Sequence, residues 1–456
     1  MTHIETKIQH YLAPGRRVHL AGIGGVSMCP LAEVLHGMGL QVQGSDMNDS
    51  ATVEHLRSLG IPVHIGHVAG DINGAEFLIR TAAIHDDNPE IAAAHCQGIP
   101  VFERAEAWGA IMQHYENAVC IAGTHGKTTT TSMTTHVFMA AQADPTVMIG
   151  GTLPMLHSGY RVGRGDTIIL ESCEYCNSFL HFFPTVAVIL NVDADHLDFF
   201  KDLEDIKASF RRFAQLVPAD GHIVANADDA NAMDALRGLP LFTFGLEREA
   251  DCRAENLQLH HGMPSFDVVV RGERYAHLTL HVAGRHNVLN ALAAAAAAYV
   301  LGLPGQAVEQ GLAAFTGAGR RFEYKGEYNG AKVYDDYAHH PGELHALLQM
   351  AKGLGYDRVI CAFQPHTYTR TKALFNEFIR ELGQADQVVL SEIYAAREKN
   401  TVGISSRDLA EQLPHAVCCA SLPQVTETLR AMAQPGDLIL TVGAGDIYTA
   451  GEALVK

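Results

Sequence analysis

The chain has 456 residues, enough for two to four domains, and 47% of them are hydrophobic, enough to form large cores. Its formal net charge of −18, from 33 Lys and Arg against 51 Asp and Glu, opposes binding to nucleic acid or to an anionic membrane through bulk charge. The nine cysteines are scattered and odd in number, and the N-terminus lacks the features of a signal peptide, so we expect reduced thiols in a cytoplasmic protein.

Near the N-terminus, residues 17–28 predict a strand, a turn with the pattern G-x-G-G, and a helix. A second predicted strand, residues 40–46, ends at Asp46 about twenty residues after the turn, where a dinucleotide-type fold places an acid that meets a ribose or a base. The pattern is shorter than G-x-G-x-x-G, so a plain α/β turn is an alternative.

A second glycine-rich turn, residues 123–129 (G-T-H-G-K-T-T), follows the apolar segment 118–122, which predicts a buried strand. Backbone N–H groups in such a turn and at the start of the following helix point at a phosphate. Lys127 can reach the outer phosphates of a nucleotide, and Thr128 or Thr129 can hold Mg²⁺. The spacing is G-x-x-G-K-T and not G-x4-G-K-[ST], so a structural turn with a surface lysine is the alternative.

Two further apolar strands end in groups that can bind a metal. The first delivers Glu171 at its carboxyl end, and the second leads into D-A-D-H, which ends at His196. The separation, 196 − 171 = 25, is that of a strand–helix–strand unit, so we expect the two strand ends to be adjacent. Mg²⁺ prefers oxygen ligands, so Glu171 fits it well, whereas His196 is a less usual ligand and could be a loop histidine.

Cys173 and Cys176 form the sole C-x-x-C pair of the sequence. A structural zinc site needs four ligands, and a second pair is missing from the sequence. We therefore interpret these thiols as incidental.

The segment 284–290 (G-R-H-N-V-L-N) precedes the most apolar stretch, residues 291–303. That stretch is too short to span a bilayer and predicts a buried, alanine-rich helix that packs closely on a sheet. Asn amides before it can read the edge of an adenine, although Asn287 could also cap the helix.

The segment 317–322 (G-A-G-R-R-F) predicts a hinge, followed by a third α/β unit. Polar motifs follow two of its strands: D-D-Y-A-H-H-P at 335–341 and Q-P-H-T-Y-T-R at 364–370. Buried neutral pairs could explain part of this pattern, but the two motifs together indicate a binding site. The guanidinium of Arg370 can meet a carboxylate with two parallel hydrogen bonds.

In order, and over almost the whole chain, these motifs resemble those of the Mur ligase family. The resemblance is strongest to the branch that joins L-alanine to UDP-N-acetylmuramate. It implies an α/β protein with a Rossmann-like domain at residues 1–115, a central P-loop ATPase-type domain at 116–317 and a Rossmann-like C-terminal domain at 318–456.

The resemblance also implies roles for individual residues. The UDP-sugar is assigned to Gly22, Gly24, Gly25, Asp46, Thr81, Arg104 and His125. ATP is assigned to Gly123, Thr124, His125, Gly126, Lys127, Thr128, Thr129, Asn287, Asn290, Arg321 and Asp336. The amino acid is assigned to Tyr337, His339, His340 and Arg370. Mg²⁺ is assigned to Thr128, Glu171 and His196, and the catalytic residues are Lys127, Glu171 and His196.

The sequence departs from the family pattern at two motifs. The family's S-S-A-I is replaced by Thr81-Ala82-Ala83-Ile84, which leaves fewer hydroxyls for the pyrophosphate. Thr367 stands where the family's Q-P-H-R-Y-T-R has an arginine, so Arg370 is the remaining cation of that motif.

The expected reaction is ATP-dependent amide formation through an acyl phosphate, with release of ADP and phosphate, in the synthesis of the peptidoglycan precursor. The expected partners are UDP-N-acetylmuramate and L-alanine, without nucleic acid or membrane insertion, and the expected state is a monomer or a homodimer.

Four alternatives remain at this stage. A ligase that reattaches recycled murein tripeptide to the same sugar nucleotide shares several motifs but would not be expected to carry Q-P-H-x-Y-T-R. A folylpolyglutamate synthase leaves the N-terminal domain unexplained. A nicotinamide-dependent dehydrogenase leaves Lys127, Glu171 and His196 without a role, and a phosphate-loop switch leaves the polar loops of the third domain without one.

Overall fold

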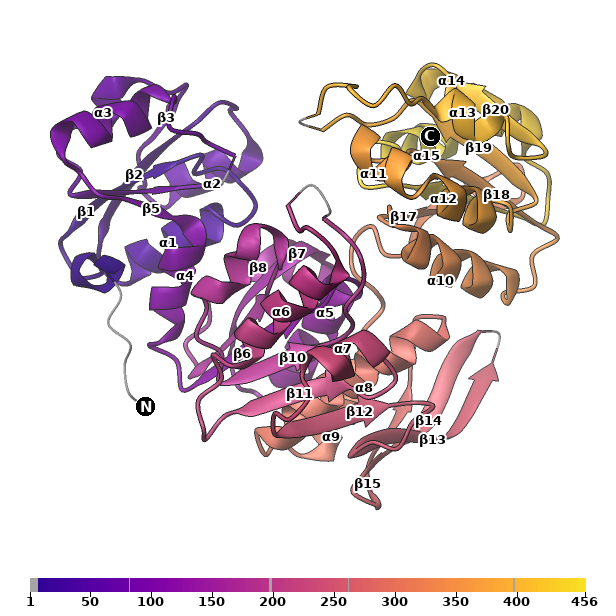
Figure 1. Ribbon diagram of the computed structural model, residues 1–456, viewed down its shortest axis with the longest axis horizontal. Helices are drawn as coiled ribbons and strands as arrows, with labels where there is room; N and C mark the ends of the chain where they lie inside the picture. Colours follow the sequence, from indigo (N-terminus) through magenta and orange to yellow (C-terminus); the bar gives the residue numbers. More distant parts are fainter. Residues whose placement is uncertain (1–6, 82, 197–198, 261, 397) are drawn as a thin grey trace.

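The computed structural model describes residues 7–456 except 82, 197–198, 261 and 397. Within these residues the chain forms three successive sheets, with five, ten and six strands. Figure 1 shows them as three bodies, with the first domain in indigo and purple, the central domain in magenta to salmon and the C-terminal domain in orange to yellow. The predicted three-domain α/β architecture is confirmed.

The first sheet is entirely parallel, with the order β3-β2-β1-β4-β5. Its strands are β1 (Arg17–Ala21), β2 (Gln41–Asp46), β3 (Val63–Ile65), β4 (Phe77–Arg80) and β5 (Val101–Glu103). Its helices are η1 (Lys7–Tyr11), α1 (Cys29–Gly37), α2 (Ala51–Ser58), η2 (Ala69–Ile72), α3 (Pro89–Gln97) and α4 (Arg104–Met112). Because the strand order reverses at β1, the glycine turn after β1 lies at a topological switch point, where open α/β sheets bind ligands.

The central sheet has the order β15-β14-β13-β12-β11-β10-β6-β9-β7-β8. Its strands are β6 (Asn117–Ala122), β7 (Thr146–Leu153), β8 (Ser158–Arg161), β9 (Thr167–Glu171), β10 (Val186–Ile189), β11 (His222–Asn226), β12 (Leu241–Gly245), β13 (Cys252–His260), β14 (Met263–Val270) and β15 (Glu273–Thr279). Its helices are α5 (Lys127–Ala140), η3 (Pro154–Leu156), η4 (Tyr175–His181), α6 (Leu203–Ala214), α7 (Ala230–Ala235), α8 (Arg285–Val300) and α9 (Gly305–Ala313).

Helix α5, which follows the phosphate loop, is packed between small residues. Ala291–Ala298 of α8 are fully buried, which confirms the predicted buried helix, and a Cβ on Gly311 of α9 would lie 2.6 Å from the Cα of Val137. Several buried hydroxyls of α5 donate to its own backbone: Thr131 donates to the carbonyl of Lys127 at 2.8 Å, and Ser132 to that of Thr128 at 2.8 Å. The threonine run is therefore helical without leaving these polar groups unpaired.

The third sheet has the order β16-β17-β21-β18-β19-β20 and is parallel except at β16. Its strands are β16 (Glu323–Tyr328), β17 (Ala331–Asp336), β18 (Arg358–Phe363), β19 (Gln387–Ser391), β20 (Ala416–Cys419) and β21 (Asp437–Val442). Its helices are α10 (Pro341–Lys352), α11 (Tyr368–Ala373), α12 (Phe375–Leu382), α13 (Ser406–Ala410), α14 (Leu422–Met432) and α15 (Tyr448–Val455).

Arg320 fixes the connection into the C-terminal domain. Its guanidinium pairs with the fully buried Asp335 at 2.9 Å and donates to the carbonyls of Gly443 at 2.6 Å and Gly445 at 3.0 Å. Its φ of 57° lies in the left-handed region, which non-glycine residues adopt rarely. These bonds compensate for that conformation and attach the linker to the domain that follows it.

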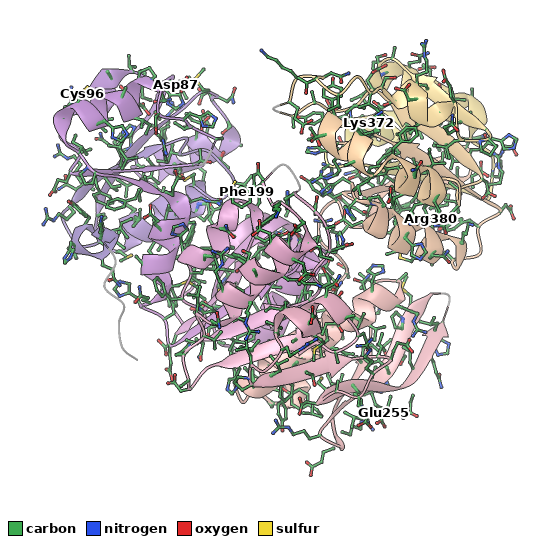
Figure 2. All side chains as sticks on the ribbon, viewed as in Figure 1. Asp87, Cys96, Phe199, Glu255, Lys372 and Arg380 are labelled. Carbon is green, nitrogen blue, oxygen red and sulfur yellow. The ribbon has the colours of Figure 1, made fainter. Side chains whose placement is uncertain are left out.

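The first and central domains meet where α4 packs on η4. A Cβ on Gly109 of α4 would lie 1.9 Å from the carbonyl oxygen of His181, so the two backbones are in direct contact. A second contact is the hydrogen bond from the hydroxyl of Tyr160 to Glu33. In Figure 2, the exposed Phe199 marks the side of the central domain that lies between the two outer domains in this view.

Among the residues described, no helix combines the length and the apolar character needed to cross a membrane.

Gly109→Ala should loosen the junction between the first and central domains, because neither backbone can move away at low cost. Overpacking of this kind costs about 1–3 kcal/mol, so the midpoint of thermal unfolding should fall. The control is Gly37→Ala at the end of α1, where an added Cβ meets nothing within 4 Å and should be neutral or slightly stabilising. Equal midpoints for the two variants would show that the contact at Gly109 is not tight.

Candidate active site

The phosphate loop lies between β6 and α5, at the carboxyl end of the central sheet. Gly123 and Gly126 have φ values of 148° and 84°, in the region that favours glycine. Added Cβ atoms would lie 2.9 Å from the side chain of Leu190 and 2.8 Å from Oδ1 of Asn290, respectively. The loop therefore requires both glycines, and Gly126 caps a helix whose first N–H groups can face an anion.

Lys127 of the loop is paired with Glu174. Its ammonium group lies 3.1 Å from Oε2 of Glu174 and donates to the carbonyl of Thr124 at 3.1 Å. The Glu174 side chain is only 3% exposed. Burial has the largest single effect and lowers the pKa of Lys127, but the charges of Glu174, Cys173 and Glu171 and the hydrogen bond to Glu174 together outweigh it and raise the pKa, so the lysine stays protonated. The sequence analysis missed Glu174, although its position three residues after Glu171 was an available signal.

Thr128 and Glu171 form an oxygen pair beside the loop. The Thr128 hydroxyl donates to Oε1 of Glu171 at 3.1 Å, and the N–H of Gly150 donates to Oε2 at 2.7 Å. Arg321 of the linker donates to the Thr128 hydroxyl at 3.3 Å. A carboxylate next to a hydroxyl is a donor set that suits Mg²⁺.

His196, the third predicted metal ligand, lies on the other side of the loop from Glu171. The spacing led us to expect that strands β9 and β10 are neighbours. This expectation was wrong, because β6 lies between them in the sheet. His196 lies 3.8 Å from Glu174 and 3.7 Å from Asp195, and its ring is 4.7 Å from that of Tyr175. The two strand ends thus converge on Lys127 from opposite sides.

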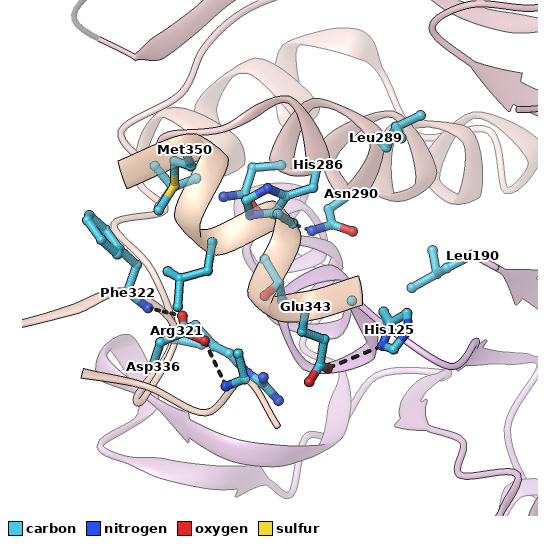
Figure 3. A pocket seen from close by; sticks show the side chains of 18 of the residues that line it. His125, Leu190, His286, Leu289, Asn290, Arg321, Phe322, Asp336, Glu343 and Met350 are labelled. Atoms are coloured by element: carbon cyan, nitrogen blue, oxygen red, sulfur yellow. Dashed lines mark hydrogen bonds and ion pairs between the residues drawn. The ribbon is translucent and has the colours of Figure 1, made fainter. Parts of the chain in front are cut away.

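A cavity of about 290 Å³ opens beside the loop (Figure 3). Among the residues that line it are His125, Gly126, Thr129, Asn287, Asn290, Arg321 and Asp336. The two Asn side chains are linked at 3.1 Å, and Asn287 also donates to the carbonyl of Ala283 at 2.7 Å. Burial raises the pKa of Asp336 to about 6, and its carboxylate accepts from the N–H of Phe322 at 2.7 Å. Some of the polar groups predicted to bind ATP therefore already form hydrogen bonds with other groups of the protein.

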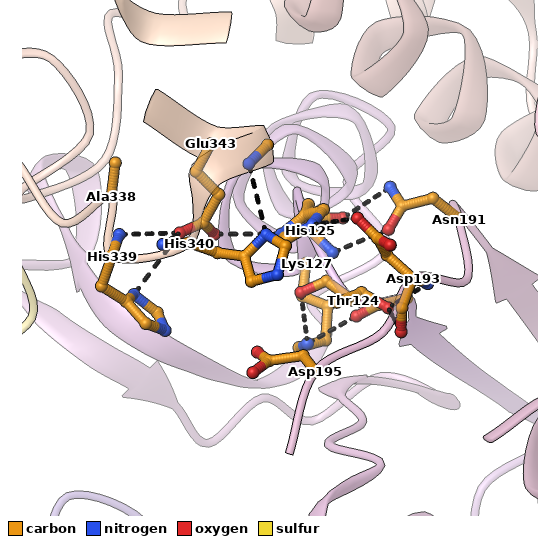
Figure 4. Close-up of polar contacts among 12 residues, drawn as sticks. Thr124, His125, Lys127, Asn191, Asp193, Asp195, Ala338, His339, His340 and Glu343 are labelled. Atoms are coloured by element: carbon orange, nitrogen blue, oxygen red, sulfur yellow. Dashed lines mark hydrogen bonds and ion pairs between the residues drawn. The ribbon is translucent and has the colours of Figure 1, made fainter. Parts of the chain in front are cut away.

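His125 joins the loop to the C-terminal domain (Figure 4). Its Nδ1 lies 3.3 Å from Glu343 of α10, and its Nε2 lies 3.5 Å from Asp193. Its ring is 4.9 Å from the ring of His340. Burial opposes protonation, but the two carboxylates outweigh this effect and raise the pKa of His125 to about 9. The backbone N–H of Asp193 in turn donates a hydrogen bond to the hydroxyl of Thr124 at 2.9 Å.

Arg370 makes a second bridge between the domains. Its Nε and one terminal nitrogen lie 3.2 and 2.9 Å from Oδ1 of Asp195, a residue of the central domain. Both side chains are nearly buried, at 12% and 8% exposure. A cavity of about 410 Å³ adjoins the pair, lined by residues of both domains that include His196, His366, Thr367 and Glu398. The cation predicted to meet an amino acid thus lies at a cavity, together with acids that the sequence analysis missed.

The other residues predicted to bind the amino acid lie on either side of this bridge. His339 is 3.4 Å from Glu343 and its ring is 5.8 Å from that of His366, and burial lowers its pKa to about 4. Tyr337 lies toward the linker, where the guanidinium groups of Arg320 and Arg321 are 4.9 and 5.0 Å from its ring. The structure separates Tyr337 from the cavity at Arg370.

Five of the residues predicted to bind the UDP-sugar gather after β1. Gly22 has a φ of 77°, and a Cβ there would lie 2.9 Å from the methyl group of Thr81. Gly25 donates its N–H to the carbonyl of Gly22 at 3.1 Å, and Gly24 donates to the Asp46 carboxylate at 2.9 Å. Asp46 therefore shapes the turn as well as facing the crevice.

Arg104 begins α4 and points back to the same turn, because it donates to the hydroxyl of Ser27. Burial lowers its pKa. The other two residues predicted to bind the UDP-sugar lie outside the glycine turn. Arg104 belongs to α4, and His125 belongs to the phosphate loop of the central domain. Ala82, one of the departures from the family pattern, lies outside the described residues.

Three family models match the chain in succession. The Mur ligase family catalytic domain matches residues 17–116, the Mur ligase middle domain matches 121–298, and the Mur ligase glutamate ligase domain matches 320–445.

Similar proteins include two curated UDP-N-acetylmuramate--L-alanine ligases. That of Caldanaerobacter subterraneus subsp. tengcongensis is 44% identical over 97% of both chains, and that of Agathobacter rectalis is 45% identical over 96% of this chain and 97% of its own. The crystal structure of UDP-N-acetylmuramate-alanine ligase from Thermotoga maritima has a TM-score of 0.80 at 30% identity, covering 96% of this chain and 98% of that one. A murein peptide ligase from Psychrobacter arcticus shares the fold, with a TM-score of 0.70 at 23% identity. The chain belongs to the Mur ligase family.

Proposed function

We propose that this protein joins L-alanine to the lactyl carboxylate of UDP-N-acetylmuramate, with conversion of ATP to ADP and phosphate. The observation that carries the proposal is the meeting, at the carboxyl end of β6, of a phosphate loop with polar groups from the C-terminal domain. The choice of substrates is supported by the identity of 44–45%, over nearly the full length, to ligases with that printed name.

The reaction needs activation because a carboxylate is a poor electrophile. We infer that the lactyl carboxylate attacks the γ-phosphate of ATP at the phosphate loop and gives an acyl phosphate. Lys127, held in place by Glu174, and the N–H groups at the start of α5 would neutralise the charge on the transferring group. Thr128 and Glu171 on one side of the loop, and His196 on the other, would hold Mg²⁺, which supplies further positive charge when bound.

The second half of the reaction is attack of the alanine amine on the acyl carbon, with phosphate as the leaving group. The cavity beside Arg370 is our proposed amino-acid site, because it is lined by both domains and opens next to His196. Orientation of the two reactants at this junction can contribute roughly 7–11 kcal/mol to the rate. Closure of the junction would also exclude water, which would otherwise hydrolyse the acyl phosphate.

We further propose that the protein is cytoplasmic and is a monomer or a homodimer. Among the residues that the structure describes, none of the nine cysteines forms a disulfide.

With ATP, Mg²⁺ and UDP-N-acetylmuramate, release of ADP should be fastest with L-alanine among the twenty amino acids. Lys127→Ala should abolish the release, because the transferring phosphoryl group loses its main cation, while binding of the UDP-sugar to the first domain should survive. A coupled ADP assay and a binding titration measure the two effects. Faster release with a murein tripeptide than with L-alanine would identify the recycling ligase instead.

Glu171→Ala and His196→Ala should each lower turnover and raise the Mg²⁺ concentration needed for half-maximal rate, since each removes a proposed ligand. Turnover measured over a range of Mg²⁺ concentrations tests this. The control is Cys176→Ala, which removes an exposed side chain from the same loop region. If the cysteine variant lost activity and the other two kept their Mg²⁺ dependence, the assignment would be wrong.

Arg370→Ala should raise the KM for L-alanine by roughly 30- to 5,000-fold, because removal of one partner of a desolvated charge pair costs on the order of 2–5 kcal/mol. Hydroxylamine trapping of the acyl phosphate without alanine should survive, since the activation half of the reaction uses the other domains. Arg380→Ala, at an exposed site on α12, is the control. A normal KM for alanine, or loss of trapping together with ligation, would exclude this role.

A further inference from the structure

Three side chains from two domains converge in front of the phosphate loop. His125 lies in the loop, Asp193 follows β10, and His340 precedes α10. One ligand atom from each lies within 4.8 Å of the other two, and this is the sole such group of His, Cys, Asp and Glu among the residues that the structure describes. Figure 4 shows the three side chains together, with Glu343 beside them.

The three donor atoms face one small space beside Gly342. A Cβ placed on that glycine would lie 3.5 Å from Nε2 of His125, 3.5 Å from Nδ1 of His340 and 3.7 Å from Oδ2 of Asp193. Gly342 is exposed and also lines the 290 Å³ cavity, so a solute can reach the space. This convergence is a second observation, because it is measured from the position of Gly342 and not between the three donor atoms.

The outer nitrogens of the two histidines have partners, and the inward Nδ1 of His340 accepts a hydrogen bond from the N–H of Gly342 at 3.3 Å, which a bound ion would replace. Nδ1 of His125 forms an ion pair with Glu343 at 3.3 Å, and Nε2 of His340 can donate to the carbonyl of Ala194 at 3.3 Å. In protein metal sites, a ligating histidine donates its other ring N–H to a carboxylate or a backbone carbonyl in this way. Both supporting partners are present here.

The donor set selects the class of metal. Two imidazoles and one carboxylate, with one position open, suit Zn²⁺ and related borderline cations and suit Mg²⁺ poorly. Nε2 of His125 and Oδ2 of Asp193 are 3.5 Å apart, close to the separation of about 3.3 Å between two ligands at 2.0–2.1 Å from a tetrahedral ion.

We propose that His125, Asp193 and His340 form a binding site for a divalent transition metal such as Zn²⁺, separate from the proposed Mg²⁺ site at Thr128 and Glu171. Because His340 belongs to the C-terminal domain and the other two to the central domain, a bound ion ties α10 to the phosphate loop. Binding does not depend on the proposed ligase activity.

The test is a titration of the full chain with Co²⁺, a visible probe for such sites, in the presence of excess Mg²⁺. Cys173→Ser and Cys176→Ser are introduced in the parent to remove exposed thiols. We expect one Co²⁺ per chain, with visible d–d bands and without a thiolate charge-transfer band, and displacement by Zn²⁺. Absence of a stoichiometric site would overturn the proposal.

His340→Gln and Asp193→Asn should each weaken Co²⁺ binding by more than the roughly 10- to 100-fold that loss of a supporting partner costs, and Glu343→Gln should fall within that range. His345→Gln, an exposed histidine of the same helix, is the control and should bind like the parent. Thermal unfolding without metal checks that each variant folds, and Asp193→Asn preserves the side-chain shape. Retention of the parent affinity in either ligand variant would contradict the site.

Discussion

The contact between Arg370 and Asp195 is the constraint on which the candidate site depends. It places the C-terminal domain against the 193–196 segment, which itself follows a strand next to the phosphate loop. Nearly buried ion pairs contribute little net stability, because the cost of desolvation offsets the attraction. Removal of one partner is nevertheless destabilising, because it leaves the other charge buried and unpaired. The pair therefore specifies the position of the domain more than it stabilises the fold. The His125–Glu343 ion pair fixes a second point of the same junction.

Behind this junction the phosphate loop is rigid. Two glycines with positive φ form the turn, and Asn290 of α8 approaches Gly126 so closely that a methyl group would not fit. Helix α5 then continues through a layer of fully buried alanines. The mobile partner in catalysis is thus expected to be the C-terminal domain, which rotates about the linker that Arg320 anchors, while the loop stays fixed.

Much of this could be predicted from the sequence, because the informative patterns are local. Apolar runs before glycine turns identified β1 and β6, and acids or histidines after apolar runs identified the ends of β9 and β10. Spacing could not give the order of strands in space, so the insertion of β6 between β9 and β10 was missed.

The partners of the charged residues were missed for the same reason. Glu174 pairs with Lys127 and Asp195 with Arg370, and each pair joins positions far apart in the chain. A local pattern shows that a charge is present, but only the packing of the domains shows which opposite charge is close enough to hold it.

The central claim is that one carboxylate is activated at the phosphate loop and then passed to an amine at the domain junction. Oxygen-18 in both lactyl carboxylate oxygens of UDP-N-acetylmuramate follows this path directly. The account predicts that a full reaction with ATP and L-alanine yields phosphate carrying one labelled oxygen, since the bridging oxygen of the acyl phosphate leaves with phosphorus. Unlabelled phosphate, formed together with the amide product, would contradict it.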